Sequence, residues 1–372
     1  MASDVFFTDL RVKPGDSLLK KFDRLIGQAG IDTIDFDGKY VAVKVHFGEW
    51  GNLAFLRQQY ARVLCDRIRA RGGKLFLTDC NTLYVGGRNN AVDHLETAFR
   101  NGYNPLCTGV HTIIADGLRG TDERCIPVEG GEYVRQAKIG AAIAEADIVI
   151  SLNHFKGHVS AGFGGALKNI GMGAGSKRGK MEMHSSGTPR ISRRKCVGCG
   201  ACVRNCANGG VRVLDGTAVI DENRCLGCGY CIAYCPRGAI MTKWDEAKPV
   251  LNRKIAEYAK AVLAGKPSFH ISRVMDVGPD CDCESGNDVP IIPDVGMFAS
   301  FDPVALDMAC ADACNRQPVI PGSAAACACA ADGETEKDVF RMVHPETDWQ
   351  AGLIHAEKLG VGTRAYALVS VG

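Results

Sequence analysis

The sequence predicts an α/β protein in which a mostly parallel, helix-covered sheet is interrupted by a small cysteine-rich insert of the α+β class. Extended apolar segments alternate with amphipathic segments before the insert, and this alternation resumes after it. Such alternation is typical of parallel sheets covered by helices. We therefore expect a discontinuous body made of residues 1–188 and 246–372, with the insert at residues 189–245.

The strands of the body are expected where apolar residues run together, and its helices where apolar residues recur with helical spacing. Before the insert, these are strands 40–47, 74–79, 110–116 and 146–152, and helices 53–71, 91–102 and 132–146. After the insert, they are strands 268–277, 291–300 and 364–372, and helices 249–266 and 301–314. No long low-complexity linker flanks the insert, so we expect it to dock against the body.

The insert carries the most specific signal in the chain. CVGCGACVRNC (196–206) and CLGCGYCIAYC (225–235) both follow C-x2-C-x2-C-x3-C, the spacing of bacterial two-cluster ferredoxins. Three thiolates on a glycine-rich turn hold one cubane, and the fourth cysteine reaches the other cluster. This pattern predicts a ferredoxin-like module with two [4Fe–4S] clusters, bound by Cys196, Cys199, Cys202 and Cys235, and by Cys225, Cys228, Cys231 and Cys206.

A structural zinc site is the alternative, but eight cysteines in two matching repeats favour clusters over a four-ligand site. Ala207 stands where proline usually follows the fourth cysteine, and this departure removes no ligand. Residues 190–245 carry nine Lys and Arg against four Asp and Glu. This charge either offsets that of the thiolate-bound clusters or forms a docking surface for an acidic electron-donor protein or reductase.

Polar side chains follow four of the expected strands, where ligands of open α/β sheets bind. They include His46, Glu49, Asp79, Asn81, Asp116, His154, Lys156 and His158. Taken singly, each residue is better explained as a cap or a turn residue. Their recurrence after successive strands favours one common site at that edge of the sheet.

The last of these groups opens a glycine-rich stretch, SLNHFKGHVSAGFGGALKNIGMGAGSKRGK (151–180). It contains neither GxxxxGK[ST] nor GxGxxG, so the standard nucleotide loops are excluded. Its glycines either form an anion-binding nest or permit a close-packed backbone crossing or a lid. The candidate cofactor-binding residues are Lys156, Gly164, Gly165 and Asn169. The candidate catalytic residues are His46, His154, His158, Lys168 and His184, with the histidines as acid–base groups suited to neutral pH.

Six later cysteines lie outside the insert: Cys281, Cys283, Cys310, Cys314, Cys327 and Cys329. They either hold a third cluster or another thiophilic metal, or they are reduced buried thiols. The neighbouring acidic residues Asp282 and Glu284 argue against Cys281 and Cys283 being part of an apolar core. Cys281 and Cys283 are therefore the candidate third site.

Composition excludes several classes of protein. A net charge of +2 argues against a general nucleic-acid binder, and no apolar run approaches the roughly 18–20 residues that span a membrane. The segment MASDVFFTDL lacks the basic and apolar regions of a signal peptide. Dense CxxC spacing among eighteen cysteines suits a reducing compartment, so we expect a cytoplasmic protein. Oxygen-sensitive cofactors would also suit an organism that lives without oxygen.

The order of motifs along nearly the whole chain resembles the iron–sulfur branch of domain-of-unknown-function family 362. The resemblance rests on VKVHFGE, TDCNTLYVGGRNNAVDH, HFKGHVSAGFGGALKNIGMGAGSKRGKMEMH, the two cysteine repeats, CDC and ASFDPVALD. It implies an α/β body with an inserted ferredoxin module. Locally, HVSAGFGGALK (158–168) is similar to a segment of nickel-pincer lactate racemases in which the lysine tethers a nicotinate-derived cofactor. Gly164 stands where a hydroxyl residue is expected in that segment, and the insert is foreign to that family.

Two functions are consistent with these features. The favoured one is an oxidoreductase that passes electrons from the clusters to a small-molecule substrate or cofactor at the body, with Lys156 and Lys168 binding an anionic group. A bare electron carrier would not need so large a body. The alternative is an electron-transfer or redox-sensing protein that docks a partner without turnover.

Overall fold

The body is built on an eight-stranded sheet in a computed structural model that describes residues 2–185, 187–329 and 337–372. The strand order is β16–β1–β15–β14–β7–β2–β3–β4. The strands are β1 (Ser3–Thr8), β2 (Tyr40–Val45), β3 (Lys74–Asp79), β4 (Thr112–Ile114), β7 (Ile148–His154), β14 (Ser268–Val274), β15 (Gly296–Ser300) and β16 (Tyr366–Ser370). Only β15 runs antiparallel to its neighbours. The predicted mixed α/β class with a mostly parallel sheet is confirmed.

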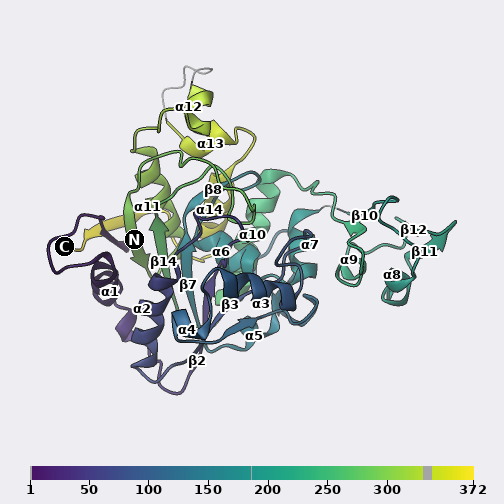
Figure 1. The fold of residues 1–372 in the computed structure, drawn as a ribbon, viewed down its shortest axis with the longest axis horizontal. Coiled ribbons are helices and arrows are strands. Elements are labelled where there is room, and N and C mark those ends of the chain that lie inside the picture. The colour runs from purple at the N-terminus through teal and green to yellow at the C-terminus, as the bar shows by residue number, and fades with distance from the viewer. Residues whose placement is uncertain (1, 186, 330–336) are drawn as a thin grey trace.

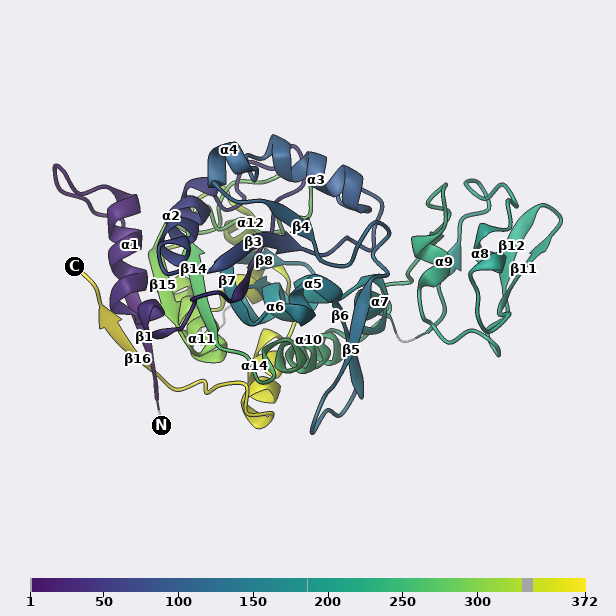
Figure 2. The same cartoon turned by 90° about the horizontal axis from the view of Figure 1, so that it is seen from below.

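Helices cover both faces of the sheet and bury a separate apolar core on each (Figures 1 and 2). One face is covered by α1 (Leu18–Gln28), α2 (Gln58–Arg69) and α3 (Ala91–Arg100). The other is covered by α6 (Ala166–Ala174), α10 (Lys248–Leu263), α11 (Pro303–Asn315) and α14 (Trp349–Lys358). All seven expected strands lie in the sheet, with ends shifted by a few residues. Strand β1 and helices α1 and α14 were not predicted.

The helix expected at residues 132–146 is wrong over its first half. Gln136–Gly140 forms strand β6, which pairs antiparallel with β5 (Glu123–Pro127), and only Ala141–Glu145 is helical, as α5. The carboxylate of Glu257 on α10 accepts hydrogen bonds from the backbone N–H groups of residues 132–134. This tertiary anchor satisfies the backbone donors of the segment without a helix, and its apolar residues support either structure.

The glycine-rich stretch is mostly regular structure rather than a loop. It forms the hairpin β8 (Lys156–His158) and β9 (Gly162–Gly164), followed by α6 and α7 (Lys177–His184). A Cβ atom at Gly171 would lie 2.3 Å from the carbonyl oxygen of Ile255 on α10. Of the alternatives, close backbone packing therefore accounts for this glycine, because α6 and α10 approach each other through it.

We expect Gly171→Ala to lower the free energy of unfolding by about 1–3 kcal/mol, because an overpacked contact outweighs the better helix propensity of alanine. Urea denaturation measures this loss. The control is Gly286→Ala, because a Cβ atom there meets nothing within 4 Å. Equal stability of the two variants would show that α6 can shift away from α10 at little cost.

The cysteine-rich segment projects from the body as a lobe (Figures 1 and 2). It contains the pairs β10 (Arg190–Ile191) with β13 (Ile240–Met241) and β11 (Val211–Leu214) with β12 (Thr217–Ile220). Each cysteine loop leads into a four-residue helix, α8 (Ala201–Arg204) or α9 (Tyr230–Ala233). The preceding glycines, Gly200 and Gly229, have φ of 72° and 73°. The two motifs therefore adopt the same left-handed turn before their helices.

Candidate functional site

A cavity of about 480 Å³ lies at the carboxyl ends of β2, β3 and β7. In the sheet, β3 and β4 follow on one side of β2, whereas β7 and then β14 lie on its other side. The chain thus reverses its direction of progress between β2 and β7, and ligands of open α/β sheets bind at such a point. The edge of the sheet predicted from the strand-end residues is where the cavity is found.

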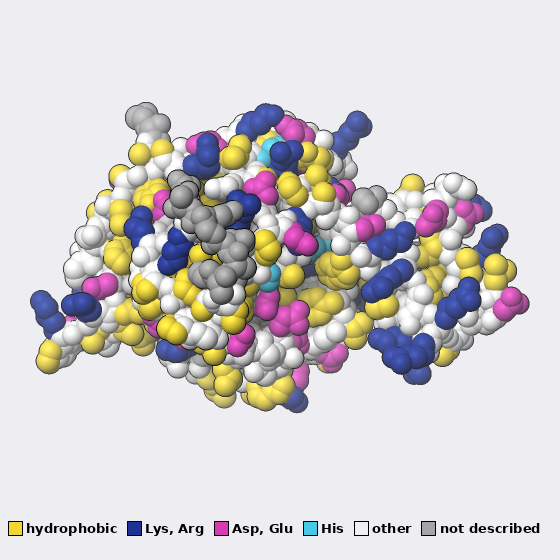
Figure 3. Space-filling model, turned by 90° about the horizontal axis from the view of Figure 1, so that it is seen from above, with side chains coloured by type: hydrophobic (Ala, Val, Ile, Leu, Met, Phe, Trp, Pro, Cys, Tyr) yellow, Lys and Arg dark blue, Asp and Glu magenta, His cyan; other side chains and the backbone are white. Residues whose placement is uncertain are grey.

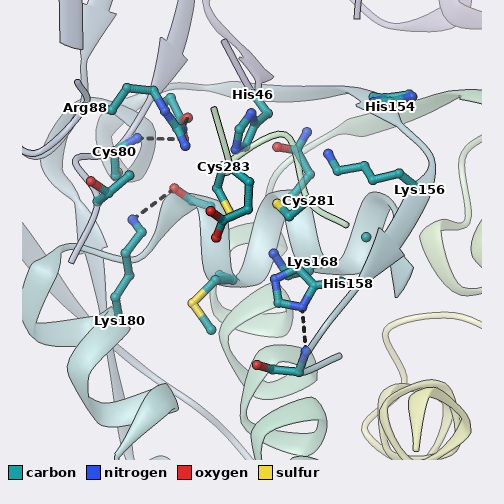
Figure 4. Close-up of a pocket in the computed structure, with 18 of the residues that line it drawn as sticks. His46, Cys80, Arg88, His154, Lys156, His158, Lys168, Lys180, Cys281 and Cys283 are labelled. Atoms are coloured by element: carbon teal, nitrogen blue, oxygen red, sulfur yellow. Dashed lines mark hydrogen bonds and ion pairs between the residues drawn. The ribbon is translucent and has the colours of Figure 1, made fainter. Parts of the chain in front are cut away.

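The cavity wall brings together the candidate catalytic, cofactor-binding and third-site residues of the body, several of which are labelled in Figure 4, whereas Glu49, Asn81 and Asp116 do not line it. The lining residues come from the ends of β2 and β7, the β8–β9 hairpin, helices α6 and α7, and the loop after β14. They are His46, His154, Lys156, His158, Gly164, Gly165, Lys168, Asn169, His184, Cys281 and Cys283. Some of these side chains are held by partners within the protein and others are available to a ligand, a difference that the sequence did not indicate.

The CDC pair faces His158 across one corner of this cavity. The ligand atoms of His158, Cys281 and Cys283 all lie within 4.8 Å of one another. Among the described residues, this is the one group of three or more His, Cys, Asp or Glu with such spacing, so its distances admit a single metal ion. A hydrogen bond from Cys283, with the nearby charges of Lys168 and Lys156, holds the pKa of Cys281 well below its usual range despite burial. The same hydrogen bond raises the pKa of Cys283.

His46 and His158 are neutral donors rather than acid–base groups suited to pH 7. Burial lowers the pKa of each ring to about 4, although each hydrogen-bonds to Cys281. The Nδ1 atom of His46 accepts the N–H of Gly48, and that of His158 accepts the N–H groups of Ser160 and Ala161. Each neutral ring must therefore carry its proton on Nε2, which leaves an N–H to donate toward Cys281.

We expect the free energy of unfolding to fall as pH drops from about 6.5 toward 4, because the unfolded chain binds protons that folded His46 and His158 exclude. Each ring contributes a slope of up to about 1.4 kcal/mol per pH unit. Urea denaturation at several pH values measures this slope. The double variant His46→Gln/His158→Gln should reduce this slope, whereas His111→Gln, at an exposed position, should leave it unchanged. The rings of His94, His184 and His270 also contribute to the slope, because burial lowers the pKa of each. An unchanged slope in the double variant would contradict the buried neutral state.

His154 and Lys156 anchor the CDC loop. Their polar groups are hydrogen-bonded within the protein and are not free to bind a substrate. The Nδ1 atom of His154 lies 2.9 Å from the Asp282 carboxylate, and its Nε2 lies 2.8 Å from the carbonyl oxygen of Met275. Lys156 donates to the same carboxylate at 2.8 Å. Burial alone would raise the pKa of Asp282, but the charges of His154 and Lys156 hold it below its usual range. Asp282 thereby fixes the residues on either side of it.

Lys168 remains available to a ligand. Among the described residues it makes no hydrogen bond or ion pair, although its charge acts on Cys281. Gly164 lies beside it, and a Cβ atom there would make ordinary van der Waals contacts, 3.6 Å from the Lys168 side chain and 3.4 Å from that of Lys156. An unpaired ammonium group in the wall of a cavity favours an anionic ligand.

Asn169 and Gly165 have structural partners as well as places in the cavity wall. The side chain of Asn169 accepts from Lys44 at 2.7 Å and donates to Asn153 at 2.7 Å. Gly165 leaves room for the Asp307 carboxylate, which accepts hydrogen bonds from the first two backbone N–H groups of α6. These contacts fix the end of α6 that carries Lys168.

Arg88 was not predicted from the sequence. Its guanidinium is buried and contacts Glu49 at 3.3 Å, Asp79 at 3.4 Å and the hydroxyl of Tyr84 at 2.5 Å. Asp79 also pairs with Lys44 at 2.9 Å. This network forms the wall at the ends of β2 and β3. In the sequence, Arg88 follows two glycines, and no pattern of residue spacing distinguishes it from an ordinary arginine in a loop.

His184 lies where the cavity meets the lobe. Its ring centre is 4.5 Å from that of Trp244, and both residues line the cavity. Burial lowers the pKa of His184. One turn earlier on α7, Met181 packs with Leu83 against the apolar core of the lobe, which includes Cys231. The lobe is therefore docked, as predicted, and one of its cysteine loops lies beside the cavity wall.

The eight cysteines of the lobe fall into two groups that cross between the motifs. Cys235, from the second motif, lines a small cavity with Cys196, Cys199 and Cys202 of the first. Burial raises the pKa of Cys225, and the nearby Cys228 and Cys206 thiolates raise it further. The fourth cysteine of each motif therefore lies with the first three of the other.

Backbone N–H groups point at sulfur in both groups of cysteines. Gly210 donates to Cys206 at 3.2 Å, Ala218 to Cys196 at 3.3 Å and Ala239 to Cys235 at 3.2 Å. Such donors stabilise thiolates and tune the metal centres that thiolates bind. The lobe is thus organised around its sulfur atoms.

The body with its strand-end cavity and the cysteine-rich lobe together match a known family. Residues 41–312 match the family described as Domain of unknown function (DUF362). The chain belongs to DUF362. No curated protein sequence matches it.

Two solved structures are similar to this DUF362 protein over part of their length. The lactate racemase apoprotein from Thermoanaerobacterium thermosaccharolyticum is 13% identical with a TM-score of 0.38, covering 74% of this chain and 51% of that one. A crystal structure of a protein from Thermotoga maritima is also 13% identical with a TM-score of 0.38, covering 83% of this chain and 59% of that one. The chain spans between half and three fifths of the length of these proteins.

The later cysteines of the DUF362 protein do not form one site. Cys310 and Cys314 lie on α11 and are buried in the apolar core, so the alternative of reduced buried thiols describes them. Cys327 is exposed on α12 (Ala324–Cys329), and the side chain of Cys329 lies outside the described residues. Among the later cysteines whose side chains the structure describes, only Cys281 and Cys283 line the cavity. Among the described helices, none combines the length and apolar character needed to cross a membrane.

Proposed function

We propose that this protein is an oxidoreductase of the iron–sulfur branch of DUF362. Residues 189–245 form a ferredoxin-like module that binds two [4Fe–4S] clusters, inserted in a body made of residues 1–188 and 246–372. Electrons pass from the clusters to a small-molecule substrate or cofactor in the cavity. The observation that carries the proposal is the crossed grouping of the eight cysteines, which is the ligand arrangement of two-cluster ferredoxins.

The spacing of these cysteines fits a cluster better than a single ion. A tetrahedral zinc ion with Zn–S bonds of about 2.3 Å would hold its thiolates less than about 4 Å apart. Within the described residues, no three of the eight sulfur atoms lie within 4.8 Å of one another. Four sulfurs around a small cavity, with backbone donors aimed at them, suit a larger inorganic core.

The residues of the body define what the cavity would do. Lys168 binds an anionic group, while the Nε2–H groups of His46 and His158 stabilise negative charge beside it. His184 and Trp244 close the side that faces the lobe. Clusters bound in the lobe would supply electrons one at a time.

The surface of the lobe supports an electron-donor protein as partner. Its basic residues are exposed and spread over the face seen in Figure 3. They are Arg190, Arg193, Arg194, Lys195, Arg204, Arg212, Arg224, Arg237 and Lys243. An acidic donor or reductase would be attracted to this surface, and its association should weaken with added salt.

Anaerobic iron and sulfide analysis of the full chain, with EPR of the reduced protein, tests the proposal. We expect about eight irons per chain and the signals of two interacting cubanes. Stoichiometric zinc in place of iron and sulfide would overturn it.

The exposed basic lobe also favours the alternative of a non-catalytic electron-transfer or redox-sensing protein. Lys168→Ala separates the two functions, with Lys13→Ala at an exposed site as control. If Lys168→Ala leaves small-molecule binding and every electron-transfer reaction of the reduced protein unchanged, the cavity has no catalytic role.

A further inference from the structure

The CDC segment presents its two thiols to the cavity on one side and its carboxylate to the protein on the other (Figure 4). Cys281 is 4% exposed, and Asp282 is 1% exposed and held by His154 and Lys156. Residues 281–284 form a turn closed by a hydrogen bond from the N–H of Glu284 to the carbonyl oxygen of Cys281, and anchoring Asp282 within this turn holds the two thiols near each other. Their sulfurs are close enough for Cys283 to hydrogen-bond to Cys281.

The hydrogen bonds of His46 and His158 help to decide whether the corner of the cavity beside Cys281 suits a metal ion or a thiolate. A histidine that binds metal through Nε2 donates the N–H of its Nδ1 to an acceptor. Here backbone N–H groups donate to Nδ1 of both His46 and His158, so both Nε2 atoms carry protons. The distances admit a metal ion, whereas the hydrogen bonds favour two N–H donors directed at a sulfur anion. Such donors stabilise a thiolate.

We infer that Cys281 and Cys283 form a dithiol–disulfide couple that reacts with a small disulfide bearing an acidic group. Cys281 is the nucleophile, because its sulfur lies within 4.8 Å of the ligand atoms of His158 and Cys283, is 4% exposed at the cavity wall, and is acted on by the charges of Lys168 and Lys156. Cys283 is the resolving thiol. This activity goes beyond the proposed function and does not depend on whether the lobe binds clusters.

The reaction consists of two thiol–disulfide exchanges. The Cys281 thiolate attacks one sulfur of R–S–S–R, forming the mixed disulfide Cys281–S–S–R and releasing RS⁻. The Cys283 thiol passes its proton to that RS⁻, and its sulfur then attacks Cys281 and releases the second RS⁻. The products are the Cys281–Cys283 disulfide, one RSH and one RS⁻. The protein loses two electrons, and the small disulfide gains them.

Lys168 determines the chemical class of that disulfide. Its ammonium group is unpaired among the described residues and lies near Cys281. Lys156 is already neutralised by Asp282. A carboxylate on the substrate would therefore bind Lys168 while the disulfide bond meets Cys281.

The test uses the anaerobically prepared full chain, reduced, desalted and mixed with either of two small disulfides of similar size. One is 3,3′-dithiodipropionate, which is anionic, and the other is 2-hydroxyethyl disulfide, which is neutral. Peptide mass spectrometry after rapid alkylation follows the segment with Cys281 and Cys283. We expect the internal disulfide to form roughly tenfold faster with the anionic reagent, and Lys168→Met to remove this preference.

The cysteine variants separate the steps. Cys283→Ser should stop at a mixed disulfide on Cys281, and Cys281→Ser should leave Cys283 unmodified on the same timescale. Cys107→Ser, at an exposed thiol outside the cavity, should behave as wild type. Iron and sulfide content, measured on each sample, reports separately on the proposed clusters. An unreactive Cys281 in wild type, a mixed disulfide that Cys283 does not resolve, or a stoichiometric metal ion lost only in the Cys281 and Cys283 variants would overturn the inference.

Discussion

The double variant Cys206→Ala/Cys231→Ala should retain about four irons per chain, half the content expected for two cubanes. These two cysteines belong to different motifs, but the crossed grouping assigns both to the same proposed cluster. Removing them therefore destroys one cluster and leaves the ligands Cys196, Cys199, Cys202 and Cys235 intact. Iron and sulfide analysis under anaerobic conditions measures the content, and EPR of the reduced protein should lose the coupling between two clusters.

The matched control is Cys202→Ala/Cys231→Ala, which also removes one cysteine from each motif. Under the crossed grouping, these residues belong to different clusters, so this variant should lose nearly all of its iron. If each motif instead held its own cluster, both double variants would lose iron equally. Equal loss would thus contradict the crossed arrangement while still allowing iron–sulfur binding, and the single variant Cys107→Ser reports nonspecific loss during preparation.

The parts of the fold that could be predicted are those in which a local pattern and the tertiary structure agree. Strands such as β2 and β3 are buried on both faces, so their apolar runs identify them. The spacing of the cysteines also agrees with their crossed grouping in the structure, because the tight turn that gathers the first three thiols of each motif is local. At residues 132–140, by contrast, Glu257 supplies hydrogen bonds from a distant helix, and the local helical pattern was misleading.

The candidate site was predictable as a location and less so as chemistry. Polar residues after successive parallel strands indicated the edge at which the cavity lies. The sequence could not show that His154 would be held by Asp282, 128 residues away, or that burial would lower the pKa of His158 to about 4. It also could not show that Arg88 lines the same wall. The charge state of a side chain and its pairing depend on burial and on long-range contacts, and the spacing of residues along the sequence does not reveal these.

Asp282→Ala should lower the free energy of unfolding by about 3–5 kcal/mol, because it leaves the buried ammonium group of Lys156 and the buried ring of His154 without their carboxylate partner. The carboxylate is 1% exposed and lies 2.9 Å from His154 and 2.8 Å from Lys156. Urea denaturation near pH 7 measures the change. Asp288→Ala, at an exposed position in the same loop, should change stability by less than about 0.5 kcal/mol.

A second substitution shows whether the loss comes from uncompensated charge. In the Asp282→Ala background, Lys156→Met removes one unpaired cation, and it should recover part of the lost stability. The same substitution in wild type should destabilise, because it takes a partner from a buried carboxylate. Additive effects of the two changes would mean that the ion pair contributes nothing as a unit. Since Asp282 separates Cys281 from Cys283, the Asp282→Ala chain should also form the internal disulfide more slowly, even where it remains folded. Its stability and the reactivity of its thiols therefore depend on the same carboxylate.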